Sequence, residues 1–349
     1  MLGGCAEANG GEVMSATSNP ARNPITPTIP FEEDGAHHGY LRLPHSHNAS
    51  AWGNLMIPIT VIKNGDGPTA LMTGANHGDE YEGPVALQNL AASLKPEDIT
   101  GRVIIVPYMN YPAFRAATRT SPIDGGNMNR IFPGKPDGTA TQKIADYFET
   151  QLVPMADLVL DFHSGGKTLD FVPFAACHRL PDADHEARCN AAMMAFNAPY
   201  SMTLLEIDNV GMYDTAVENQ GKVFVSTELS GGGSISAQTA RIALRGARNL
   251  LIHGGVLKGE IDHQPTAILD MPDGDCFCFA EQEGLFEICV DLGETVNKGE
   301  TIAKIWPLDR TGAAPTPVQA KRSGILAGRH FPGLVAMGDC LAVIGVVMA

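Results

Sequence analysis

The sequence has little of what marks nucleic-acid-binding, membrane or secreted proteins. Its 24 Lys and Arg residues are outnumbered by 39 Asp and Glu residues, and the formal net charge of −15 excludes a surface that neutralises phosphates. No apolar run approaches the roughly 20 residues that a membrane helix needs. The seven cysteines are scattered and odd in number, which argues against a disulfide framework and predicts a reducing, cytoplasmic compartment. Neither nucleic acid nor a membrane is therefore an expected partner.

The 349 residues suffice for two domains, and the character of the sequence changes along them. Residues 1–22 are rich in Gly, Ala, Ser and Asn and are predicted to be disordered, with Met14 as an alternative start to Met1. Residues 23–50 show no regular pattern, but apolar runs then alternate with helical spacing up to residue 262. The expected strands are 55–62, 70–73, 103–108, 157–162 and 223–227, and the expected helices are 83–94, 140–152, 184–197, 211–219 and 236–253. This alternation predicts an α/β domain over 23–262 with both faces of its sheet covered.

Residues 263–349 form a second predicted domain, with short strands, many Gly and no convincing helix. A weak repeat relates 284–302 to 324–341 and resembles the two halves of a biotinyl/lipoyl-type barrel sandwich. A carrier domain of that type needs a Lys flanked by Met at a tight hairpin, and Lys321 has no such neighbour. We therefore expect a structural or pocket-closing β-domain instead of a carrier.

Three residues that commonly bind metals follow apolar runs. His77 and Glu80 come just after one run, and His163 comes just after another. Two imidazoles and a carboxylate at the carboxyl ends of strands are the ligand set of a catalytic zinc that keeps one position open for water. Glu82 is an alternative to Glu80, and Asp161 is predicted to orient a ligand imidazole. We expect one metal ion per chain, zinc or another divalent ion, and a hydrolase.

Further polar residues suggest how such a hydrolase would treat its substrate. Glu228 ends a predicted strand before a Gly run, where a carboxylate can act as general base and acid. Asn129 and Arg130 are adjacent and offer donors to a carboxylate. Arg119 is the candidate that polarises the scissile carbonyl, and Arg115 competes for that place.

Four motifs in order resemble the succinylglutamate desuccinylase/aspartoacylase family of the zinc carboxypeptidase superfamily. They are H-G-D/N-E, N-R-x-F, D-x-H and a late Glu before a Gly-rich loop, and they lie within about residues 55–262. The resemblance implies a zinc-carboxypeptidase-like mixed sheet flanked by helices, with a smaller C-terminal all-β, barrel-sandwich-like domain. It also implies zinc on the His-Glu-His set, Glu228 as base and acid, Asn129 and Arg130 at the substrate α-carboxylate, and Arg119 at the carbonyl oxygen. A homodimer is a further expectation from the family.

One departure from the family points to the substrate side chain. Where aspartoacylases have an Arg about ten residues before the catalytic Glu, this chain has Glu218. An acid there suits a side chain that ends in an ammonium, although Glu206 and Asp208 compete for this role. Three further segments resemble a subgroup that removes acetyl from N-acetyl-2,4-diaminobutyrate in ectoine breakdown, namely 23–30, 121–127 and 210–216.

The substrate is accordingly expected to be a small N-acyl amino acid. Deacylation of a different N-acyl amino acid and a carboxypeptidase activity are alternatives, because an Arg can bind any α-carboxylate. An inactive binding protein on the same fold is a third.

Overall fold

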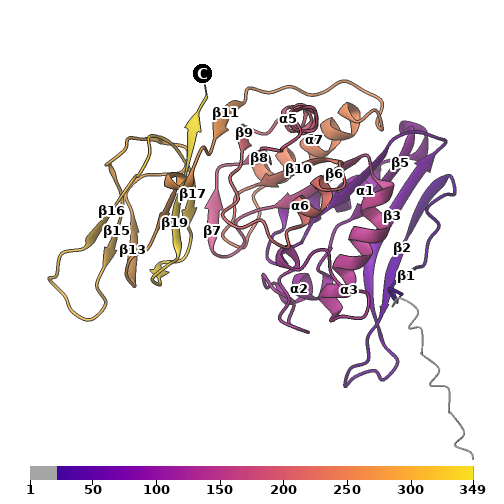
Figure 1. Ribbon diagram of the computed structural model, residues 1–349, viewed down its shortest axis with the longest axis horizontal. Coiled ribbons are helices and arrows are strands. Elements are labelled where there is room, and N and C mark those ends of the chain that lie inside the picture. The colour runs from indigo at the N-terminus through magenta and orange to yellow at the C-terminus, as the bar shows by residue number, and fades with distance from the viewer. Residues whose placement is uncertain (1–21, 349) are drawn as a thin grey trace, which may run out of the picture.

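A long mixed sheet is the main feature of the computed structural model, which describes residues 22–348 (Figure 1). The segment expected to be disordered, 1–22, lies outside this range except for Arg22. At the centre of the sheet four parallel strands run in the order β5 (Gly101–Val106), β4 (Thr69–Thr73), β6 (Leu158–His163) and β10 (Val223–Glu228). Their carboxyl ends meet at one edge, which is where ligands bind in such sheets.

Helices cover both faces of this sheet, as the continuous apolar strands predict. One face packs on α1 (Glu82–Ser93), α5 (Ala183–Phe196) and α7 (Ala237–His253). The other packs on α3 (Ala140–Tyr147), a π-helical turn (Phe148–Leu152), α4 (Val153–Met155) and α6 (Tyr213–Glu218). Alternate residues of β6 point to opposite faces, so Leu160 joins the first core and Val159 the second. Asp161 and His163 share the face of Val159, so these two candidate site residues lie on the side of the sheet that α6 covers.

The expected mixed α/β architecture is confirmed, but the prediction for residues 23–50 is wrong. They contain β1 (Thr26–Pro27) and the ten-residue β2 (Gly35–Pro44), which pairs with β3 (Asn54–Asn64) along its whole length. Much of β2 is solvent-exposed near the edge of the sheet, and Leu41 and Leu43 are its only fully buried side chains. A single short apolar alternation is a weak signal in a sequence.

Several shorter elements complete the catalytic part of the chain. They are α2 (Tyr111–Ala116), β7 (Leu169–Phe171), β8 (Phe174–Cys177) and β9 (Tyr200–Thr203). Among the described residues, no helix is long and apolar enough to cross a membrane.

The sheet continues from 23–262 into the C-terminal residues. The strand β11 (Ala267–Asp270) pairs with β9 and with β19 (Cys340–Val347), which in turn pairs with β17 (Gly324–His330). The strands β12 (Phe277–Phe279) and β14 (Thr295–Val296) also join this part. A separate antiparallel sheet contains β16 (Thr316–Gln319), β15 (Thr301–Trp306), β13 (Gly284–Ile288) and β18 (Leu334–Val335). The strand β17 also pairs with β7, so the C-terminal residues support the segment that follows the predicted metal ligand His163.

Candidate active site

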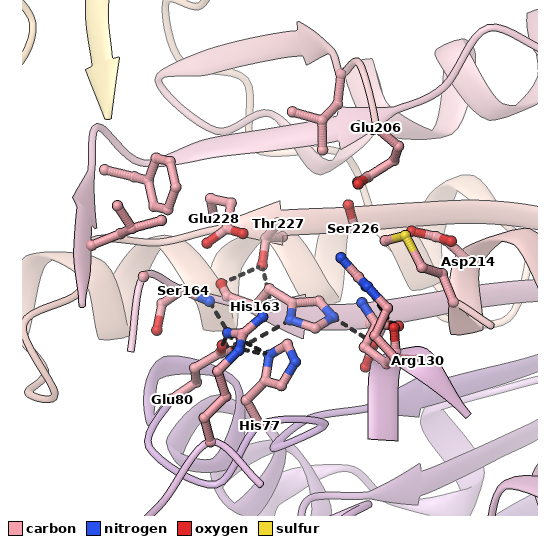
Figure 2. A pocket seen from close by; sticks show the side chains of 18 of the residues that line it. His77, Glu80, Arg130, His163, Ser164, Glu206, Asp214, Ser226, Thr227 and Glu228 are labelled. Atoms are coloured by element: carbon pink, nitrogen blue, oxygen red, sulfur yellow. Dashed lines mark hydrogen bonds and ion pairs between the residues drawn. The ribbon is translucent and has the colours of Figure 1, made fainter. Parts of the chain in front are cut away.

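His77, Glu80 and His163 meet in one pocket at the carboxyl ends of β4 and β6 (Figure 2). Glu80 Oε1 lies 2.8 Å from His77 Nδ1, and Glu80 Oε2 lies 3.1 Å from His163 Nδ1. One donor atom from each residue lies within 4.8 Å of the other two, and His77 and Glu80 are almost fully buried. We call these residues the metal triad, because two imidazole nitrogens and a carboxylate oxygen fit a single divalent cation.

The second nitrogen of each imidazole has its own acceptor. His77 Nε2 lies 3.2 Å from Asn127 Oδ1, and His163 Nε2 lies 2.9 Å from Asp161 Oδ2. Thr73 donates a hydrogen bond to Asp161, which fixes the carboxylate. With a metal bound, these Nε2 partners would hold the ring protons, so that each Nδ1 would offer its lone pair to the cation in place of its contact with Glu80. Asp161 therefore has the position expected from the sequence.

The environment holds Glu80 as a carboxylate. Burial alone would raise the pKa of Glu80, but the neighbouring His77 and His163 outweigh burial and lower this pKa. The alternative ligand, Glu82, is buried elsewhere and accepts a hydrogen bond from Thr239 of α7. Burial raises the pKa of Glu82 to about 7. Glu80 is thus the carboxylate in the triad.

The small residues after each triad histidine allow close packing of the loops. A Cβ on Gly78 would lie 2.0 Å from the carbonyl carbon of Ala113 in α2, and a Cβ on Gly165 would lie 2.2 Å from the carbonyl oxygen of Leu169. Both neighbours are backbone atoms, so a larger residue would displace a loop that carries the triad.

Glu228 faces the triad from the neighbouring strand. It is the register partner of His163 in the parallel pair β6 and β10, and it lines the same pocket (Figure 2). Its Oε2 is buried without a hydrogen-bond partner in the described residues. Burial and the negative charge of Glu80 raise the pKa of Glu228. A carboxyl group in this position can both accept and return a proton.

The candidate substrate-binding residues also line this pocket. Arg119 Nη1 lies 3.3 Å from His77 Nδ1 and 3.8 Å from Glu80 Oε1. Asn129 accepts a hydrogen bond from the backbone N–H of Tyr213, which leaves its Nδ2 to donate to a ligand. Arg130 is largely exposed on the pocket wall and donates to the carbonyl of Asn129.

Arg115 does not contribute to the pocket. It is exposed on α2, where its guanidinium donates to the hydroxyl of Tyr111. The competition left open by the sequence therefore favours Arg119.

Glu218 does not line the pocket. Its carboxylate lies 2.8 Å from His178 Nδ1 and faces an adjacent cavity instead. Two other acids, Glu206 and Asp214, line the pocket that contains the metal triad (Figure 2). Glu206 is one of the sequence candidates, whereas Asp214 is not; an Asp in the first turn of a helix is ordinary and gives no signal in the sequence.

With this geometry established, comparison with known proteins defines the family. Residues 66–254 match the succinylglutamate desuccinylase/aspartoacylase catalytic domain. The chain belongs to this family.

Relatives within the family are similar over nearly the whole chain. The N-alpha-acetyl-L-2,4-diaminobutyric acid deacetylase of Halomonas elongata is 53% identical over 93% of this chain and 96% of its own length. The product-bound ectoine utilization protein EutE (DoeB) of Ruegeria pomeroyi is 66% identical with a TM-score of 0.92, covering 93% of this chain and 99% of that structure. A succinylglutamate desuccinylase of Silicibacter sp. TM1040 is also 66% identical, with a TM-score of 0.91 and the same coverage.

Proposed function

We propose that this protein is a metal-dependent deacetylase that converts N-α-acetyl-L-2,4-diaminobutyrate to L-2,4-diaminobutyrate and acetate, a reaction of ectoine breakdown. The observation that carries the proposal is the metal triad with the unpartnered carboxyl of Glu228 facing it, in a chain 53% identical to a deacetylase of this specificity. A pocket that presents both acidic and basic side chains agrees with a zwitterionic amino-acid substrate.

The metal is proposed to be zinc, one ion per chain, held by the metal triad. The Nδ1 atoms of His77 and His163 and the Glu80 carboxylate are donor types that zinc accepts. When bound, a divalent cation of this kind supplies Lewis acidity to the amide carbonyl and lowers the pKa of water.

The residues of the chain have complementary tasks in this proposal. Glu228 takes the proton of the attacking water and returns it to the leaving α-amine. Arg119 donates to the oxygen on which negative charge develops. Arg130 and Asn129 bind the α-carboxylate and fix the position of the amide relative to Glu228.

Two further expectations, a cytoplasmic location and a homodimer, accompany this function. A cytoplasmic location is supported by the described cysteines, all six of which carry free thiols. A homodimer stays a prediction, and the molar mass of the purified protein in solution tests it.

Acetate release by the purified protein, measured together with its metal content, tests the proposed function. The substrate panel contains N-α-acetyl-L-2,4-diaminobutyrate, N-acetyl-aspartate, N-succinylglutamate and a dipeptide. We expect one zinc per chain and the highest kcat/KM for the acetylated diamine. Preference for N-succinylglutamate or the dipeptide would replace the proposed substrate, and ligand binding without turnover would indicate an inactive protein.

A further inference from the structure

A second cluster of titratable groups lies beside the pocket, and two of its members, Glu206 and Asp214, line the pocket away from His77 and Glu80 (Figure 2). It contains Glu206 from the segment after β9, Asp214 and Glu218 one turn apart on α6, and His178 just after β8. His178 Nδ1 lies 2.8 Å from Glu218, while His178 Nε2 lies 3.7 Å from Glu206 and 3.9 Å from Asp214. We call these four residues the acidic cluster.

The acidic cluster is built into the interior of the protein. His178 is 8% exposed and Asp214 is 6% exposed. The Nε2 of His178 has no hydrogen-bond partner among the described residues, although two carboxylates face it just beyond hydrogen-bond distance. Its nearest acceptors are these two carboxylates, and because neither is held at hydrogen-bond distance, both keep lone pairs for a ligand with N–H donors.

The charge of the acidic cluster is unbalanced. Burial would lower the pKa of His178, but Glu206 and Glu218 outweigh burial and raise this pKa to about 10. His178 therefore carries one positive charge at neutral pH, against three carboxylates. Burial raises the pKa of Asp214 to about 6, so Asp214 is still mainly ionised at pH 7. An additional cation between Glu206 and Asp214 would offset the remaining negative charge.

Glu206 and Asp214 connect the acidic cluster to the catalytic pocket. Both line the pocket that contains the metal triad, Glu228 and Arg130, whereas Glu218 does not. A cation that reaches them through this pocket can be part of the substrate. In 2,4-diaminobutyrate the α-carboxylate and the side-chain ammonium are separated by only three carbon atoms, so both can be bound within one small pocket.

We propose that Glu206 and Asp214 bind the side-chain ammonium of the substrate and set the preference for a diamino acid. The inference rests on the proposed function and names the residues that select its substrate. His178 and Glu218 are positioning residues, because Glu218 holds the imidazole that stands behind the two binding carboxylates.

A divalent cation is the competing occupant, since one donor atom each of His178, Glu206 and Asp214 also lies within 4.8 Å of the others. The surroundings favour the ammonium. His178 Nδ1 is already paired with Glu218, and His178 does not line the catalytic pocket, so a ligand that enters there meets Glu206 and Asp214. The groups left for the ligand are carboxylate oxygens, which accept the N–H donors of an ammonium.

Kinetics on two matched substrates test the proposal. N-acetyl-L-2-aminobutyrate has the carbon chain of the acetylated diamine but no side-chain ammonium. We expect Glu206→Gln and Asp214→Asn each to lower kcat/KM for the acetylated diamine about 10- to 100-fold, the scale of a hydrogen bond to a charged group. Their kcat/KM for the neutral substrate should change less than about threefold. Glu281→Gln removes an exposed carboxylate of the C-terminal part and should change neither value.

The ratio of the two kcat/KM values is insensitive to partial misfolding, because a smaller active fraction lowers both alike. Equal losses on both substrates, or no loss on either, would overturn the inference. The wild-type enzyme gives a second measurement, since free 2,4-diaminobutyrate should inhibit at least about tenfold more strongly than 2-aminobutyrate, and equal inhibition would contradict the ammonium site.

The outcomes also separate this inference from the proposed function. Failure of the wild-type holoenzyme to hydrolyse the acetylated diamine would remove the proposed function itself. If the wild type hydrolyses the acetylated diamine but Glu206→Gln and Asp214→Asn lower kcat/KM equally for both substrates, or for neither, only the roles of Glu206 and Asp214 would be removed. Two zinc ions per wild-type chain and one per Asp214→Asn chain would replace the ammonium site with a second metal site.

Discussion

The metal triad and the acidic cluster use the same residue types, and Glu206 and Asp214 connect the cluster to the pocket that contains the triad. In each, donor atoms of histidine and carboxylate side chains gather within 4.8 Å of one another. The triad has two imidazoles for one carboxylate, whereas the acidic cluster has one imidazole for three carboxylates. This ratio changes the charge that each end offers to a ligand.

The two ends differ in the groups that surround each imidazole. In the metal triad, Glu80 lies between the Nδ1 atoms of the two imidazoles, whose Nε2 atoms face Asn127 and Asp161. In the acidic cluster, both nitrogens of the single imidazole, His178, face carboxylates. The triad can therefore offer two imidazole nitrogens and one carboxylate to a metal ion. The part of the acidic cluster that lines the pocket offers only carboxylate oxygens, which suit an ammonium.

The largest expected effect is the loss of the metal. Glu80→Gln keeps the size of the side chain but removes the charge between the two triad imidazoles, so we expect the zinc content to fall well below one per chain. Activity should fall beyond about 10⁴-fold, the upper range for a single acid–base group. Glu82→Gln is the matched control, because this neighbouring buried acid is directed toward α7. Metal loss in the Glu82 variant alone would reverse the assignment of the ligand.

Glu228→Gln should separate proton transfer from metal binding. The variant keeps a side chain of the same shape beside the triad, but it has no carboxylate to accept the proton. We expect kcat to fall by about 10²- to 10⁴-fold while the zinc content is unchanged. Metal analysis and acetate release on the same preparation measure both quantities. A kcat near that of the wild type would show that another group moves the proton.

Arg119→Ala should have a smaller effect on kcat. We expect a loss of about 10²-fold, the lower end for a donor to a developing oxyanion, because the Arg119 side chain is 47% exposed and solvent screens its charge. Arg115→Ala removes the same charge from the neighbouring helix and should leave kcat unchanged. If the two variants lost activity equally, the effect would come from the net charge near the pocket and not from contact with the carbonyl oxygen.

The contrast between the two ends also shows what the sequence could reveal. The strands β4, β6 and β10 were recognisable because both their faces are buried, which produces continuous apolar runs. The metal triad follows those runs directly. By contrast, the partly exposed β2 and the three-residue β7 lack such a signal.

The acidic cluster was less accessible to sequence reasoning because of its surroundings. His178 follows β8, a short strand that was not predicted, and Glu206 lies in an irregular segment. Spacing relative to Glu228 pointed to Glu218, but the α6 helix turns this side chain toward His178. Only the folded chain shows that Asp214, one turn earlier, faces the pocket. Sequence spacing identified the correct helix, whereas the side-chain direction needed the three-dimensional structure.

The smallest expected effect is a pH dependence specific to the acidic end. Burial raises the pKa of Asp214 to about 6, with Glu206 and Glu218 acting in the same direction and His178 opposing them. Below pH 6 Asp214 becomes neutral and attracts an ammonium less strongly. The kcat/KM for the acetylated diamine, relative to that for N-acetyl-L-2-aminobutyrate, should therefore fall as the pH decreases, by at most about tenfold per pH unit.

Use of this ratio isolates Asp214 from the rest of the pocket. Titration of Glu228 or of the metal triad affects both substrates and cancels in the ratio, whereas the charge of Asp214 matters only for the substrate with an ammonium. The Asp214→Asn variant should consequently show a ratio that is low and independent of pH between 5 and 7. A wild-type ratio without pH dependence, or an equal decline in the Asn variant, would mean that the preference for the diamine arises elsewhere in the pocket.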